Sequence, residues 1–93
     1  MRYLITYDIA NDKKRTKLSD ILETYGYRVN YSVFELEINK TKLKKLLSII
    51  EEKELIDKKH DSLRFYHICE NCLPKSFELS NRADIFEAHE LFV

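Results

Sequence analysis

The stretch Tyr3–Asp8, with the sequence Tyr-Leu-Ile-Thr-Tyr-Asp, constrains the fold more than any other part of the chain. It is nearly all apolar and rich in aromatic and β-branched residues, which is typical of a β-strand. Because a strand that is apolar on both faces is normally covered on each side, we predict a central strand over Arg2–Asp8. This strand ends in a carboxylate, which is costly to bury without a partner. Asp8 is therefore either satisfied by nearby backbone donors or placed there for chemistry.

Two amphipathic helices are predicted from apolar side chains at helical spacing. The first begins at residues 11–12, Asn-Asp, which are good N-caps, and ends near Tyr25. Gly26, the single glycine of the chain, follows at the position where a left-handed residue commonly ends a helix. The second helix begins at Asn39 or Thr41, and its apolar stripe is flanked by lysines and glutamates.

The remaining periodic segments are predicted to be β-strands. Tyr27–Ile38 is too long for one strand, so we expect a break near residues 30–32. Ser62–Cys69 is the next strand, after a charged loop, and Lys75–Leu79 is predicted to form a short additional one. The element order is then βαββαβ plus a short strand. It indicates an α+β domain, in which two helices cover one face of an antiparallel sheet.

The second face of this sheet is predicted to be an interface. In the third strand, Phe34 and Leu36 alternate with Glu35 and Glu37, so we expect one buried and one exposed face there. Several other strands are apolar on both faces. Since a small domain most easily covers an apolar sheet face with its own copy, we predict a homodimer packed through the open faces or edges.

The composition indicates a folded protein whose charge is divided along the chain. Among its 93 residues 44% are hydrophobic, and no apolar run approaches the length of a membrane span. We expect a cytoplasmic protein with no membrane partner. Residues 1–50 carry ten basic and six acidic side chains, whereas residues 51–93 carry six and ten. This asymmetry suggests a basic end for a polyanion, although small domains often show such a division by chance.

Asp8 is followed by a helix start that is rich in cations. Lys13, Lys14, Arg15 and Lys17 lie on the first turns of the predicted helix. One interpretation is structural, with Asp8 satisfied by backbone donors and the cations in solvent. The other is a Mg²⁺ site, because this ion takes one or two carboxylates and completes its shell with water and phosphate oxygens. A two-fold dimer would supply two Asp8 carboxylates, beside which the cations would hold a phosphodiester backbone.

The chain resembles a known family in a combination of motifs. These are Tyr7-Asp8 at the end of the first strand, the basic run Asp12–Lys17, Tyr25-Gly26, and Arg28–Glu35 with the sequence Arg-Val-Asn-Tyr-Ser-Val-Phe-Glu. Together they are similar to the small CRISPR-associated endoribonuclease family, the lesser core subunit of the spacer-acquisition machinery. The resemblance covers about residues 1–80.

The resemblance implies a ferredoxin-like fold and a homodimer with one metal site at the two-fold axis. It implies that Asp8 is the Mg²⁺ ligand, and that Tyr7 and Arg15 take part in cleavage or substrate contact. The lysine at position 17 stands where arginine is also common, and it lacks the planar guanidinium for bidentate phosphate contact. The predicted nucleic-acid-binding set is Lys13, Lys14, Arg15, Lys17 and Arg28.

The family has two roles, and both are expectations for this chain. One is metal-dependent cleavage of RNA or double-stranded DNA. The other is structural, since the dimer bridges subunits of the larger CRISPR integrase. A same-fold endoribonuclease toxin is a third interpretation. We predict a nuclease and adaptation domain over residues 1–80 and a tail over residues 81–93 that packs within the dimer or docks onto the integrase.

Four further residues are assigned to structure. Phe34 is expected in the core, because aromatic side chains of strands usually pack. Cys69 and Cys72 supply only two of the four ligands that a zinc site needs. We therefore expect two reduced, partly buried thiols in preference to a zinc site. His67 is expected to be a packed core or edge residue of the last long strand.

Overall fold

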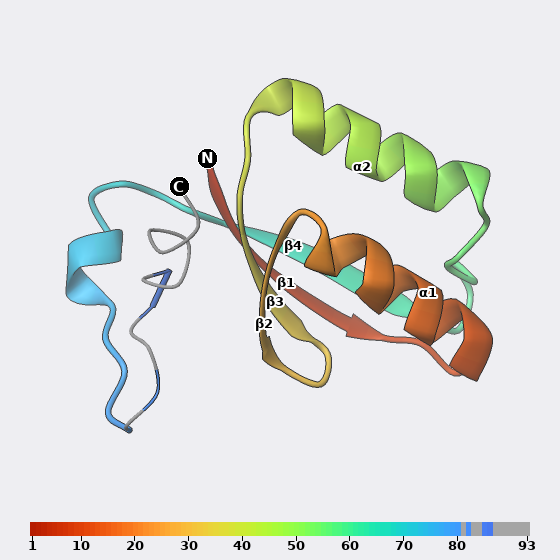
Figure 1. The fold of residues 1–93 in the computed structure, drawn as a ribbon, viewed down its shortest axis with the longest axis horizontal. Helices are drawn as coiled ribbons and strands as arrows, with labels where there is room; N and C mark the ends of the chain where they lie inside the picture. Colours follow the sequence, from red (N-terminus) through yellow and green to blue (C-terminus); the bar gives the residue numbers. More distant parts are fainter. Residues whose placement is uncertain (81, 83–84, 87–93) are drawn as a thin grey trace.

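The structure is a computed structural model that describes residues 1–80, 82 and 85–86. Its four strands form one antiparallel sheet in the order β2-β3-β1-β4, and both helices lie on one side of it (Figure 1). The elements are β1 (Arg2–Asp8), α1 (Asp12–Glu23), β2 (Gly26–Asn30), β3 (Val33–Glu37), α2 (Lys40–Glu52), β4 (Ser62–Ile68) and a short 3₁₀ turn (Leu73–Lys75). The predicted βαββαβ order and ferredoxin-like fold are confirmed.

The core lies between the sheet and the two helices. Alternate residues of β1 face the helices, so Ile5 and Tyr7 are buried whereas Asp8 is exposed. Phe34 and Leu36 of β3 lie beside them and are fully buried, which confirms the core assignment of Phe34. The helices contribute the apolar stripes seen in the sequence, through Leu18, Leu22, Leu46 and Ile50.

Asparagine side chains begin both helices. The side chain of Asn11 accepts a hydrogen bond from the amide of Lys14, and Asn39 does the same for Lys42. The first helix ends two residues earlier than predicted, with Thr24 as its C-cap.

The predicted left-handed conformation of Gly26 is wrong. The described residues include no glycine with positive φ, and Gly26 is the first residue of β2. Glycine is needed there for space, because an added Cβ would lie 2.3 Å from the backbone oxygen of Glu35 and 2.9 Å from Leu36 Cδ1.

The last residues of β1 extend past the end of the neighbouring strand β3. β1 pairs with β3 only as far as Thr6, opposite Val33, whereas on its other side it pairs with β4 to its last residue, with Asp8 opposite Ser62. The break predicted near residues 30–32 is confirmed as the turn between β2 and β3. That turn lies beside the end of β1, where the amide of Tyr7 donates to the carbonyl of Ser32 at 3.1 Å (Figure 1).

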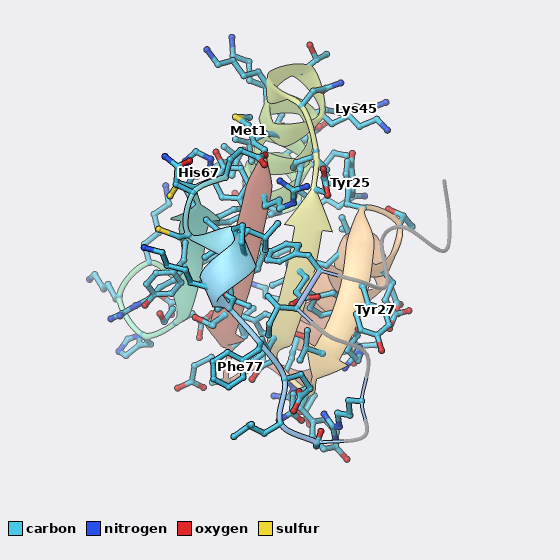
Figure 2. All side chains as sticks on the ribbon, turned by 90° about the vertical axis from the view of Figure 1, so that its left-hand side faces the viewer. Met1, Tyr25, Tyr27, Lys45, His67 and Phe77 are labelled. Carbon is cyan, nitrogen blue, oxygen red and sulfur yellow. The ribbon has the colours of Figure 1, made fainter. Side chains whose placement is uncertain are left out.

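The segment after β4 crosses the face of the sheet that the helices leave open. Figure 2 looks onto this face, with the 3₁₀ turn and Phe77 in front of the strands. The strand predicted over Lys75–Leu79 is absent, because residues 76–79 have no regular structure. Phe77 and Leu79 remain 67% and 89% exposed.

Glu35 was expected on an exposed face, and this expectation is wrong. Its side chain is buried, and its Oε1 accepts a hydrogen bond from the amide of Phe86 at 3.1 Å. Arg82 Nη1 similarly donates to the carbonyl of Val29 at 3.1 Å. The first part of the predicted tail therefore returns to the sheet of its own subunit. The other residues of that tail, 81, 83–84 and 87–93, lie outside the described part of the chain.

Within residues 1–80, 82 and 85–86, no helix has the length and apolar character needed to cross a bilayer.

Candidate functional site

A cleft of about 620 Å³ lies at the carboxyl end of β1, between α1 and the β2–β3 turn. Four of the residues predicted to act in catalysis or binding line it, namely Tyr7, Asp8, Arg15 and Arg28. The remaining lining residues are Ile9, Thr16, Ser19, Asp20, Tyr31 and Ser32. The cleft exists because β1 extends past β3, so that its last residues face the turn instead of a strand.

Asp8 presents an exposed carboxylate at the rim of this cleft. Its backbone is held by pairing with β4, while its side chain points to the opposite face of the strand from that of Tyr7. Within the described part of the chain, no three His, Cys, Asp or Glu side chains come together as metal ligands. One subunit therefore offers Asp8 as a single carboxylate. Mg²⁺ is commonly held by one or two carboxylates with water and phosphate oxygens, so Asp8 alone or together with Asp8 of a second copy would fit that ion.

Tyr7 points inward and belongs to the floor of the cleft. The residue is 6% exposed, and its hydroxyl donates to the carbonyl of Tyr31 at 3.1 Å. Burial raises the pKa of the Tyr7 phenol above its ordinary value, against a smaller opposing effect of the Arg28 guanidinium. At neutral pH the phenol is therefore a proton-bearing donor that holds the turn, and it is not a phenolate.

Arg15 connects the start of α1 to the end of β1. Its Nη1 donates to the carbonyl of Ile9 at 2.9 Å, and its Nη2 forms an ion pair with Asp12. The side chain is 44% exposed. The guanidinium is thus oriented by the protein and still accessible from the cleft, which is the arrangement that a phosphate contact requires.

Arg28 is held by the protein on several sides. Its Nη2 donates to Ser19 Oγ at 2.6 Å and its Nη1 to the carbonyl of Tyr31 at 3.0 Å. Its Nε donates to Glu23 at 3.1 Å, and the guanidinium lies 5.1 Å from the centre of the Phe34 ring. These contacts fix the β2–β3 turn against α1. They make Arg28 an organiser of the cleft, with few donors left for nucleic acid.

The three lysines of the predicted binding set lie outside the cleft. Lys13 and Lys17 border a separate groove between the helices, together with Lys45 and Lys53. Lys14 points to a third surface, near the loop before β4. The cations near Asp8 in the sequence are therefore divided among several surfaces, because a helix turn directs consecutive side chains to different sides, and the nucleic-acid-binding role of the three lysines stays a prediction.

Sequence reasoning missed the residue that supports the Asp8 strand end from the other side. Asp61 Oδ1 accepts a hydrogen bond from the amide of Ala10 at 3.2 Å, and its Oδ2 accepts one from the amide of Asp57 at 2.9 Å. It thereby connects the segment after β1 to the loop before β4. Its place directly before a strand is visible in the sequence, but the pairing of that strand with β1 is not.

The structure changes one of the assignments made for the cysteines and His67. The thiols of Cys69 and Cys72 are exposed, whereas partial burial was predicted. Their Sγ atoms are 2.9 Å apart. His67 is an exposed residue of β4 whose ring stacks on that of Tyr3 at 5.0 Å, so its assignment as an edge residue is confirmed.

Comparison with known proteins matches most of this chain to a described family. The profile described as "CRISPR associated protein Cas2" matches residues 1–76. A relative from Methanospirillum hungatei, named CRISPR-associated endoribonuclease Cas2 2, is 47% identical over 79 residues, which are 85% of each chain. The crystal structure of Streptococcus pyogenes Cas2 superposes with a TM-score of 0.71 at 28% identity, over 86% of this chain and all of that one. A chain of a partial Cas6-RT-Cas1–Cas2 complex has a TM-score of 0.65 at 34% identity, over 84% and 89%.

Proposed function

Because this chain belongs to the CRISPR-associated Cas2 family, we propose that it is a Mg²⁺-dependent endonuclease of CRISPR adaptation. Its substrate is RNA or double-stranded DNA. The relative from Methanospirillum hungatei is named an endoribonuclease, which supports cleavage of a phosphodiester and favours RNA as the first substrate to test. The observation that carries the proposal is the cleft in which Tyr7, Asp8, Arg15 and Arg28 come together at the end of β1.

The active form we propose is a homodimer in which the two copies of Asp8 face one ion. Two features support it. Asp8 is exposed at a strand end, and the described part of one chain has no group of three ligands that would serve a metal alone. Mg²⁺, when bound, supplies activation of water and stabilises charge on the phosphoryl group. Since carboxylate ligands must be deprotonated, Mg²⁺ binding should weaken at acid pH.

The other residues of the cleft position the substrate. Arg15 directs its accessible guanidinium toward the cleft and would bind a phosphate next to the cleaved bond. Tyr7 and Arg28 both donate to the carbonyl of Tyr31, so they would hold the β2–β3 turn that forms one wall of the cleft. The lysines of α1 would contribute long-range attraction for nucleic acid.

The test is cleavage of structured RNA, unstructured RNA and duplex DNA by purified protein with Mg²⁺. We expect Asp8→Asn to abolish the metal-dependent cleavage, because the amide removes the anionic ligand while preserving the shape of the side chain. Glu52→Gln is the matched control, since it makes the same chemical change at an exposed residue of α2. Equal cleavage by wild type and Asp8→Asn would contradict the proposal and identify the activity as contamination.

A second role is favoured by the similarity to a chain of the Cas1–Cas2 complex. We propose that the chain also acts as the subunit that joins copies of the larger CRISPR integrase, with the tail over residues 81–93 as the contact. Deletion of that tail should abolish co-purification with the integrase, whereas Asp8→Asn should leave it unchanged. Retained co-purification after deletion would contradict the tail assignment. The family match favours both roles over the same-fold toxin.

A further inference from the structure

We propose that Cys69 and Cys72 form a reversible redox site, in which the two thiols are oxidised to an intramolecular disulfide by exchange with a small-molecule disulfide. The site lies on the turn that follows β4, away from the cleft described above. It depends on the geometry of this turn and on the accessibility of both sulfur atoms.

The turn holds the two sulfur atoms in contact. Their Sγ atoms are 2.9 Å apart, and a disulfide bond has a length of about 2.05 Å, so bond formation requires a movement of only about 0.9 Å. Two backbone hydrogen bonds close the turn, because the amides of Cys72 and Leu73 donate to the carbonyl of Cys69 at 3.1 and 3.2 Å. The side chain of Glu70, within the same turn, forms an ion pair with Arg2 of β1.

Both thiols are exposed, so an oxidant reaches them from solvent. Hydrogen bonds from Cys72 lower the pKa of the Cys69 thiol, and the same contact raises the pKa of the Cys72 thiol. Thiolate is the reactive form of cysteine. Once one of the two thiols is deprotonated, its sulfur attacks the oxidant, and the other cysteine resolves the mixed disulfide.

The chemistry balances with oxidised glutathione as the co-reactant. One of the two cysteine thiolates attacks one sulfur of oxidised glutathione, the disulfide bond of that molecule breaks, and one glutathione leaves. The other cysteine then loses its proton and attacks the sulfur of the first, which releases the second glutathione and forms the Cys69–Cys72 bond. The two cysteines lose two electrons and two protons, which the two glutathione molecules gain.

A zinc site is a weaker interpretation of the same pair. Zinc needs four ligands, and no third Cys, His, Asp or Glu joins the two thiols among the described residues. His67, the nearest histidine in the sequence, stacks on Tyr3 and is not grouped with the two thiols.

The experiment follows the thiols of the full chain in buffers of oxidised and reduced glutathione, by intact-mass measurement after acid quenching. We expect wild type to lose two hydrogen atoms without gaining glutathione, and excess reduced glutathione to restore it. Cys72→Ser should stop at one glutathione on Cys69, and Cys69→Ser should stop at one glutathione on Cys72. Circular dichroism of both variants checks that they remain folded.

Two outcomes would overturn the proposal. The first is a wild-type chain that stays reduced or retains bound glutathione. The second is purified protein that carries zinc with both thiols unreactive, which would replace the redox site by a metal site shared between two chains.

Discussion

Substitution of Arg28 by lysine tests whether this residue organises the cleft or binds nucleic acid. Lysine keeps the positive charge, but its ammonium cannot contact Ser19, Tyr31 and Glu23 at once, as the planar guanidinium does. At least two hydrogen bonds from a charged donor are therefore lost. Each such bond contributes about 1.5–3 kcal/mol when buried.

The expected loss of stability is smaller than the sum of the free energies that two fully buried hydrogen bonds would contribute. The Arg28 side chain is 36% exposed, so water screens part of each interaction. Taking about half of the buried value for two bonds, we expect Arg28→Lys to lower the free energy of unfolding by about 2 kcal/mol. For a domain of this size, such a change lowers the melting temperature by roughly 8–16 °C.

Urea unfolding followed by circular dichroism measures this change. Arg64→Lys is the matched control, because Arg64 is an exposed residue of β4 whose Nη1 donates to the hydroxyl of Tyr66. We expect that control to change the unfolding free energy by less than about 0.5 kcal/mol. If Arg28→Lys also changes it by less than about 0.5 kcal/mol while weakening nucleic-acid binding, the structural role is refuted and Arg28 is a phosphate contact.

Three further substitutions test the packing around the cleft. Gly26→Ala should lower the free energy of unfolding by about 1–3 kcal/mol, because its Cβ meets the backbone oxygen of Glu35 at 2.3 Å; an unchanged urea midpoint would contradict this. Asp61→Ala should lower the free energy of unfolding by roughly 1 kcal/mol and speed hydrogen exchange of the Ala10 amide. Unchanged exchange would show that the hydrogen bond from the Ala10 amide to Asp61 is not formed in solution. Tyr7 has a raised phenol pKa, so the folded state keeps this proton longer than the unfolded state, and stability falls as pH rises above about 10. Tyr7→Phe should show a smaller fall in the urea midpoint over that range, and identical pH profiles would contradict the assignment.

Local periodicity was sufficient to predict the main elements. The β1 strand, both helices with their asparagine caps, and the break between β2 and β3 follow from side-chain alternation and capping. These features depend on residues only a few positions apart, so a single sequence contains them. The ends of elements were less well predicted. Gly26 was assigned to a helix end, whereas its lack of a side chain is required by the neighbouring strand.

The candidate site was only partly predictable, because its geometry depends on contacts between segments that are distant in the sequence. Asp8 and Arg15 were identified from their positions at a strand end and a helix start, and both line the cleft. The lysines near them in the sequence were assigned to the same site, but a helix turn directs them to other surfaces. Asp61 is 53 positions from Asp8 along the chain, and only the pairing of β1 with β4 brings the two strand ends together.

The sequence by itself therefore determined the order and type of the elements, the apolar faces, and the acid at the end of the central strand. The tertiary structure decided which side chains meet, because contacts between distant segments depend on strand register and on the packing of α1 against the sheet. It decided that Tyr7 and Arg28 hold a turn, that Glu35 is covered by the segment near Phe86, and that the two thiols are exposed and in contact. These outcomes depend on three-dimensional proximity, which periodicity within one segment does not encode.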